Sequence, residues 1–336
     1  MRKLVIGCAF LIACGGETKP AQDDTALLRD QPSATATAAP PPEPPASEDV
    51  ARGTKALEAG DLGTAKSAFE AAIAKNARDA AAHHYLGVVL DKQNDKAGAE
   101  REYKAALAIR PDLAEAAANL AALDLDAQKY DDAIALLKPV LAKRADSADA
   151  WFNLALAYAG KNDQQRATEA FDAAVKLTPN DAMVLYTYGH TLASWNQSDA
   201  AIARLRAASV AAGTQGDLLG SIGHELLLLR AVPDCIAAFD KAIAAKEAAQ
   251  FRTERALCKL ANKDAVGATT DLEVATKNEP TYAYAHYWLA TRRMADKRWA
   301  DAAKELEAYL KLEPNGPKAK SAHEALVIAK NGGKKK

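Results

Sequence analysis

The sequence contains none of the short motifs that mark common catalytic sites. It has no GxSxG nucleophile elbow, no HExxH zinc motif, no phosphate-binding P-loop and no CxxC pair. Carboxylates are plentiful, but they fall on expected turns and outer helix faces, and no two of them stand out as an acid–base pair. We therefore expect a protein that is not an enzyme and that carries no cofactor.

Aromatic residues, glycines and β-branched runs are scarce, while alanine is abundant. Aromatics make up 6% of the 336 residues, and glycine accounts for 18 of them. Strands favour β-branched and aromatic residues, whereas alanine is the strongest helix former. The composition therefore predicts a mostly helical chain.

An excess of charge of one sign is also missing. Lys and Arg number 43, Asp and Glu number 44, and the formal net charge is −1. Proteins that bind nucleic acid or acidic lipid through their overall charge are strongly basic. We therefore expect no nucleic-acid partner.

No apolar run is long enough to cross a bilayer, but the chain begins with a short one. Arg2 and Lys3 precede the mostly apolar residues 4–13, a stretch far below the ~20 residues of a membrane-spanning helix. A positive start, a short apolar core and small residues before a cleavage site are the features of a signal peptide. Residues 1–13 are therefore predicted to be one.

The apolar run ends in the tetrapeptide LIAC, whose last residue is Cys14. The tetrapeptide resembles the bacterial lipobox, which implies that the signal is cleaved before Cys14 and that its thiol is acylated. A match ending at Cys8 leaves almost no apolar core ahead of it, and an ordinary secretory signal with an incidental cysteine is the other alternative. By resemblance to enteric lipoproteins, Gly15 after the cysteine favours the outer membrane, with the protein facing the periplasm.

Residues 14–45 are predicted to be the lipidated N-terminus and a disordered, Pro-rich tether. Large apolar side chains are almost absent there, so little can offset the entropy of ordering the chain. Prolines between residues 40 and 45 favour extended polyproline geometry.

The rest of the chain repeats with a period of 34 residues, with one step of 33. Small side chains recur at this interval at Ala65, Ala99, Ala133, Ala167, Ala201, Cys235, Ala268 and Ala302. A bulky apolar side chain follows each of them at Phe69, Tyr103, Leu137, Phe171, Leu205, Phe239, Leu272 and Leu306. A second small series precedes them at Gly53, Gly87, Ala121, Ala155, Gly189, Gly223, Ala256 and Ala290.

This order of sites resembles the tetratricopeptide repeat. The best unit, residues 148–181, carries the family's characteristic residues at Trp151, Leu154, Tyr158, Ala167, Phe171, Ala174 and Pro179. No unit of this kind can bury its apolar face alone, so neighbours must stack. We predict an all-α fold: a right-handed superhelical solenoid of about eight helix-turn-helix units at residues 46–316, a capping helix at 317–330 and a disordered basic tail at 331–336.

In the tetratricopeptide family the first helices line a concave surface that usually grips a segment of a partner protein. The corresponding positions are here mostly apolar and aromatic: His84, Phe152, Leu156, Met183, Tyr186, His190, His224, Leu227, Tyr284, Tyr287 and Met294. Aromatic and Met side chains suit the recognition of apolar anchors, although simple helix packing is the alternative for each. Asn119 and Asn153 fit part of the family's carboxylate clamp, but the matching lysines are missing.

The remaining cysteines and histidines give weaker signals. Cys235 and Cys258 fall on adjacent helices, where a disulfide is possible but burial as small residues is the default. His190 and His224 lie 34 residues apart, so they occupy equivalent sites and could form a two-histidine ladder. A metal site needs more ligands, and none are arranged for it.

We therefore expect a lipid-anchored scaffold or assembly adaptor of the bacterial cell envelope. Its partners would be one or more envelope proteins, held in the groove, and the membrane, reached through the N-terminal lipid. The alternative is a scaffold for polysaccharide export or peptidoglycan binding, because Tyr186, Tyr284 and Tyr287 could stack on sugar rings.

Overall fold

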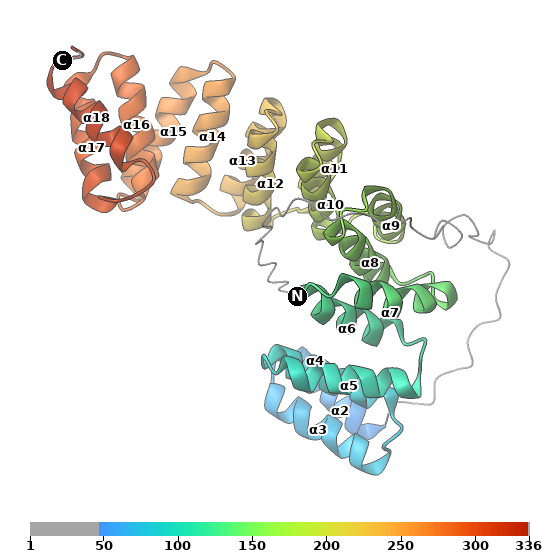
Figure 1. Cartoon of the computed structure of the whole chain (residues 1–336). Coiled ribbons are helices and arrows are strands. Elements are labelled where there is room, and N and C mark those ends of the chain that lie inside the picture. The colour runs from blue at the N-terminus through green and yellow to red at the C-terminus, as the bar shows by residue number, and fades with distance from the viewer. Residues whose placement is uncertain (1–46, 335–336) are drawn as a thin grey trace. The chain divides into compact units, whose positions relative to one another are not determined.

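The computed structural model describes residues 47–334, and this range folds into seventeen helices without a strand. The predicted signal peptide, Cys14 and the tether lie outside the described residues. The helices form eight hairpins followed by one more helix (Figure 1). The first helices of the hairpins are α2 (Glu48–Glu58), α4 (Ala80–Lys92), α6 (Ala114–Asp126), α8 (Ala148–Gly160), α10 (Ala182–Ser194), α12 (Gly216–Leu228), α14 (Ala249–Ala261) and α16 (Ala283–Ala295). The second helices are α3 (Leu62–Lys75), α5 (Lys96–Ile109), α7 (Tyr130–Lys143), α9 (Gln164–Leu177), α11 (Ser198–Ala211), α13 (Val232–Ala245), α15 (Ala265–Asn278) and α17 (Trp299–Leu312), and α18 (Ala319–Lys330) ends the series.

Each hairpin packs on the next one along the chain. The second helix of every hairpin contacts the first helix of its successor, and most neighbouring first helices also touch each other. Stacking of this kind completes the core that a single hairpin cannot close. The prediction of an all-α repeat fold with about eight helix-turn-helix units and an added C-terminal helix is confirmed.

The turn inside each hairpin has a residue in the left-handed backbone conformation. These residues are Gly60, Asn94, Gln128, Asn162, Asn196, Arg230, Lys263 and Lys297. Glycine and asparagine adopt this conformation most readily and end helices for that reason. In four hairpins an aspartate side chain then accepts a backbone N–H and caps the second helix, at Asp61, Asp95, Asp163 and Asp264.

The repeating positions of the sequence form the interior of the hairpins. All eight small residues of the series from Ala65 to Ala302 are 0% exposed, and the bulky residues that follow them are at most 1% exposed. Glycine on the first helix makes room for some of the bulky rings. A Cβ added at Gly87 would lie 2.6 Å from the Tyr103 ring, which is closer than van der Waals contact allows.

The seventh hairpin, α14 and α15, departs from this pattern. The positions held by Trp151, Leu154 and Tyr158 in the fourth hairpin are held here by three cations, Arg252, Arg255 and Lys259. They surround the carboxylate of Asp271 on α15, which is 1% exposed. Arg252 also pairs with Glu247, and Arg255 with Asp240, so three carboxylates face three cations.

Helix α18 covers the last hairpin. Its alanines Ala322 and Ala329 are buried in one cluster with Leu306 and Tyr309 of α17. A turn over residues 331–334 ends the helix, and the backbone N–H of Gly333 donates to the carbonyl of Ile328 at 2.9 Å.

Candidate protein-binding groove

The first helices of the hairpins lie in a row, and most of them contact the first helix of the next hairpin. We call the surface made by α4, α6, α8, α10, α12, α14 and α16 the first-helix face. It holds all eleven residues that the sequence predicted for the groove. The structure brings some of them together in one hollow and places others in the core or at the C-terminal end of the series.

A hollow of about 400 Å³ lies on this face between α10, α12 and α14. We call it the central hollow; Tyr186, Asp217, Gly220, Ser221, His224, Gln250, Phe251 and Glu254 line it. Two of these, Tyr186 and His224, belong to the predicted groove, whereas the other six were not predicted.

Gly220 is the residue without a side chain among those that line the central hollow. Phe152, Tyr186 and Gly220 follow one another at 34-residue intervals, so the glycine stands where the two preceding hairpins have an aromatic ring. A Cβ at Gly220 would already clash with the Phe251 ring. The comparison of repeats therefore shows where a side chain is missing, and the Phe251 ring of the next hairpin fills that space.

Two histidine–glutamate pairs tie the three first helices together. The Nδ1 atom of His190 lies 2.8 Å from Oε1 of Glu225, and Nδ1 of His224 lies 2.8 Å from Oε2 of Glu254. Each pair joins one first helix to the next, from α10 to α12 and from α12 to α14. The predicted two-histidine ladder is therefore a series of histidine–glutamate pairs, in which each histidine bonds a glutamate.

The glutamates raise the pKa of both histidines. The hydrogen bond from Glu225 raises the pKa of His190 against the opposing effect of burial, and Glu254 does the same for His224. The glutamates are the less exposed partners, with side chains 13% and 16% exposed, against 39% and 52% for the histidines. The Tyr186 ring stacks on His190 with the ring centroids 6.2 Å apart, so the tyrosine is held next to the first pair.

Toward the N-terminus the first-helix face is closed by internal hydrogen bonds. Nδ2 of Asn119 lies 3.1 Å from Nε2 of His84, and Asn153 donates to the carbonyl of Ala118 at 2.7 Å. Burial lowers the pKa of His84 to about 4, so this imidazole is neutral at pH 7. Both asparagines of the partial clamp pattern are therefore engaged between neighbouring first helices.

Several other members of the predicted groove, on α8, α10 and α12, contribute to packing. Met183 and Leu227 lie against the buried cluster of α10 to α14, each partly exposed. Phe152 is 9% exposed, and its ring meets Phe171 edge-on at a centroid distance of 6.0 Å. Leu156, also on α8, is partly exposed. For Phe152 in particular, the helix-packing alternative describes the observed contacts.

Tyr284, Tyr287 and Met294 lie on α16, which is separate from the central hollow. Tyr284 and Tyr287 both contact the buried ring of Tyr309, at centroid distances of 6.4 and 5.5 Å. The Lys318 ammonium group lies 6.0 Å from the centroid of the Tyr287 ring. Met294 packs on the same cluster, so these residues anchor the C-terminal end of the solenoid.

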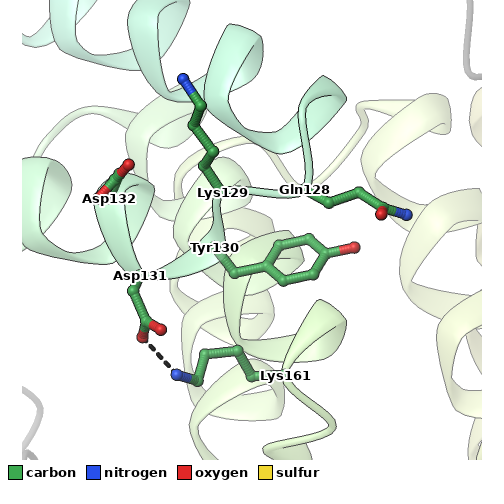
Figure 2. A pocket seen from close by; sticks show the side chains of 6 residues that line it. All are labelled: Gln128, Lys129, Tyr130, Asp131, Asp132 and Lys161. Carbon is green, nitrogen blue, oxygen red and sulfur yellow. Dashed lines mark hydrogen bonds and ion pairs between the residues drawn. The ribbon is translucent and has the colours of Figure 1, made fainter. Parts of the chain in front are cut away.

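A second hollow, of about 340 Å³, lies at the turn between α6 and α7. Figure 2 shows its six lining side chains, with Asp131 of α7 paired to Lys161 after α8. The Tyr130 ring occupies the space above Gly160, where a Cβ would clash with it. Two lysines and two aspartates line this hollow, Lys129 and Lys161 with Asp131 and Asp132. We interpret it as part of the contact between the third and fourth hairpins.

Cys235 of α13 and Cys258 of α14 form a disulfide in the structure, with their Cα atoms 6.2 Å apart. That separation lies within the usual range for a disulfide. Both residues are 0% exposed. The bond joins the sixth hairpin to the seventh, and both cysteines belong to the same buried cluster as Phe251.

Residues 47–334 show neither a metal centre nor a membrane-spanning helix. In this range no group of three or more His, Cys, Asp or Glu side chains is placed to hold a metal ion. None of the helices described there has both the length and the apolar character needed to cross a membrane.

Comparison with known proteins identifies the repeat. A family model described as tetratricopeptide repeat matches residues 50–114 and 118–182, which include most of the first four hairpins. No curated protein sequence matches the chain.

Solved structures of repeat proteins are similar to the chain at low sequence identity. Yeast Tom70 is 16% identical over 88% of this chain and 66% of Tom70, with a TM-score of 0.49. MamA from Desulfovibrio magneticus RS-1, as the fragment from residue 41 to the end, is 22% identical over 46% of this chain and 88% of that fragment, with a TM-score of 0.41.

The family match and the 34-residue spacing agree with the eight stacked hairpins. Stacked repeats of this type present extended surfaces for binding other proteins. Residues 50–114 and 118–182 match the tetratricopeptide repeat, the stacked hairpins continue to residue 312, and this fold suggests a scaffold for protein–protein interaction.

Proposed function

We propose that this protein is a membrane-anchored scaffold or assembly adaptor of the bacterial cell envelope, and that it holds a partner segment on its first-helix face. The observation that carries the proposal is the central hollow. Of the two hollows described above, it is the one that lies on the first-helix face. It combines aromatic rings with polar groups that can orient a ligand. The arrangement offers groups that can bind and orient a ligand.

Two features of the chain support the envelope location. The LIAC sequence at residues 11–14 resembles the lipobox of exported, acylated proteins. The Cys235–Cys258 disulfide is of the kind that persists outside the reducing cytosol. The sequence feature and the disulfide are independent, and both favour an oxidising compartment.

Site-specific photo-crosslinking in cells tests the binding surface. A photoreactive amino acid at Ser221, an exposed residue of the central hollow, is expected to capture a defined partner protein. The matched control is Val210 on α11, which is 73% exposed and lies outside the hollow. Tyr186→Ala should remove the crosslink from position 221 without changing the melting temperature by more than a few degrees. Equal capture from both positions would contradict the proposed surface.

The lipid anchor is tested separately by labelling cells with a radioactive or clickable fatty acid. We expect the wild type to carry the label and to sediment with outer membranes, and Cys14→Ala to remain unlabelled and uncleaved. Cys8→Ala is the control and should behave like the wild type. Normal cleavage and acylation of the Cys14→Ala protein would show that the anchor has been assigned wrongly.

The second candidate function is binding of polysaccharide or peptidoglycan. The observation that favours it is the composition of the central hollow, where Tyr186 stands beside Asp217, Gln250 and Glu254, since sugar sites often combine an aromatic ring with planar polar side chains. It predicts that purified glycan strands bind the protein and that Tyr186→Ala abolishes this binding, with no partner protein crosslinked at Ser221.

A further inference from the structure

The carboxylates of the central hollow outnumber its fixed cations. Two carboxylates, Asp217 and Glu254, line it. Asp217 pairs with Lys246 at 2.6 Å, and this lysine is the fixed cation that contacts a lining carboxylate. Glu254 forms hydrogen bonds with His224 and Gln250. Both partners are neutral at pH values where His224 is uncharged. The hollow therefore has an excess of negative charge at pH values where His224 is uncharged.

Glu254 is the carboxylate whose charge acts most strongly on a ligand. Its side chain is 16% exposed, whereas that of Asp217 is 78% exposed. Solvent screens an exposed charge, and a partly buried one interacts over the same distance with larger energy. In the other hairpins the residues equivalent to Glu254 are uncharged, for example Asn119, Asn153 and Ser221.

Aromatic rings form the apolar part of the same hollow. Tyr186 stands on α10, where its ring stacks on His190. The Phe251 ring of α14 packs against Gly220 and is 6% exposed. A ring next to a carboxylate fits a side chain with an apolar stem and a positive head. Arginine and lysine have that build, and arginine in particular stacks on aromatic faces.

We propose that the central hollow takes an arginine or lysine side chain of the partner segment, with its stem against Tyr186 and Phe251 and its charged head at Glu254 and Asp217. This inference rests on the proposed function and adds the chemistry of the partner. The partner is a peptide segment that carries one basic residue among apolar ones, and its remaining side chains lie along the first-helix face. An acidic segment is repelled by the same carboxylates.

Selection from a library of random twelve-residue peptides displayed on phage tests this inference with the purified protein as bait. Peptides that require Tyr186, recognised by their loss of binding to Tyr186→Ala, are expected to share an arginine or lysine beside aliphatic residues. Replacement of that arginine by citrulline, which keeps the shape and removes the charge, should weaken binding by at least about tenfold. Glu254→Gln should weaken the arginine peptide by a similar factor and leave the citrulline peptide unchanged.

The matched control is Glu305→Gln. Glu305 also pairs with a histidine, His286, at 2.6 Å, but it lies on α17 outside the hollow. This variant should bind the arginine peptide like the wild type, and both glutamine variants should keep the wild-type melting temperature within a few degrees.

The possible outcomes separate this inference from the function on which it rests. Tyr186-dependent peptides without a basic residue, or with equal affinity for the wild type and Glu254→Gln, overturn the cation site and leave the scaffold proposal standing. Failure to select any Tyr186-dependent peptide, or binding of glycan strands alone, overturns both.

Discussion

Arg255 of α14 donates from its Nε atom to Oδ2 of Asp271 on α15 at 2.9 Å, in a position where all other hairpins except the first have Leu, Ile or Tyr. Lys259 reaches the same oxygen at 2.8 Å. The cations hold the pKa of the Asp271 carboxyl below its usual range despite its burial, which by itself would raise it. In the seventh hairpin the three positions equivalent to Trp151, Leu154 and Tyr158 all hold cations. Each of the other seven hairpins has an apolar residue in at least one of these positions.

Removal of Asp271 should destabilise the protein strongly. Asp271→Ala leaves Arg255 and Lys259 without their shared buried partner, and loss of one side of a buried ionic cluster costs about 3–5 kcal/mol. Urea unfolding followed by circular dichroism measures this change. Asp240→Ala is the control, because Asp240 pairs with the same arginine but its side chain is 54% exposed, and we expect a loss of less than about 1 kcal/mol. Similar losses in the two variants would contradict a special role for the buried carboxylate.

The histidine–glutamate pairs should make stability depend on pH in a defined direction. Glu225 and Glu254 raise the pKa of His190 and His224 above the ordinary value of 6.5. A raised pKa in the folded state contributes stability that is complete below about pH 6.5 and is lost as the pH rises through the raised pKa. We expect wild type to exceed a His190→Gln/His224→Gln variant in stability at pH 6, and the difference to shrink by pH 9.

Melting curves of the two proteins across this pH range measure the difference. His84 titrates in the opposite direction, because burial lowers its pKa, but it is present in both proteins and cancels. Each pair is partly exposed, so its contribution should stay below about 1 kcal/mol. The exposed His323→Gln serves as control, and a difference between wild type and the double variant that does not change with pH would exclude the pairs as its source.

The close approach of Gly87 to Tyr103 predicts the effect of a single added methyl group. Gly87→Ala places a Cβ 2.6 Å from a ring atom of Tyr103, and overpacking of this kind costs about 1–3 kcal/mol. In Gly63→Ala the new Cβ meets only Oδ1 of Asp61, at 3.6 Å, so the helix preference of alanine should leave stability unchanged or raise it by up to about 1 kcal/mol. Thermal unfolding of both variants tests the contrast, and equal effects of the two substitutions would refute the steric explanation.

The disulfide between Cys235 and Cys258 predicts that both thiols resist alkylation in unreduced, denatured protein. The two cysteines are separated by 23 residues in the sequence, and a cross-link over a loop of that size stabilises the folded state by about 3 kcal/mol. Mass spectrometry after labelling counts the free thiols, and urea unfolding with and without reductant measures the stability. Cys258→Ala should unfold like the reduced wild type. Detection of two labelled thiols in protein kept unreduced would end this interpretation.

The sequence by itself determined the hairpins, because their interior depends on residues close together in one repeat. A small residue followed four positions later by a bulky one, as in Ala167 and Phe171, occurs in all eight repeats. This spacing specifies two helices and the face of each that is buried. Local turn residues such as Asn162 and Asp163 mark where one helix ends and the next begins. Period and fold class could therefore be read without coordinates.

The sequence predicted the candidate site only in part, because the site combines different positions of successive repeats. Glu225 follows His190 by 35 residues, whereas Glu254 follows His224 by 30, so one repeating interval does not lead to both pairs. The same holds for Phe152, which belongs to the row of Tyr186 in the sequence but packs against Phe171 in the structure.

The tertiary structure alone decided which side chains meet across hairpins. A 34-residue period gives each residue its position within a repeat, but contact between repeats depends on how neighbouring helices are offset and on which side chains are absent. Gly220 shows the reason most clearly: the Phe251 ring of the next hairpin fills the space of its missing side chain. Asp217 of α12 and Glu254 of α14 line the hollow beside it.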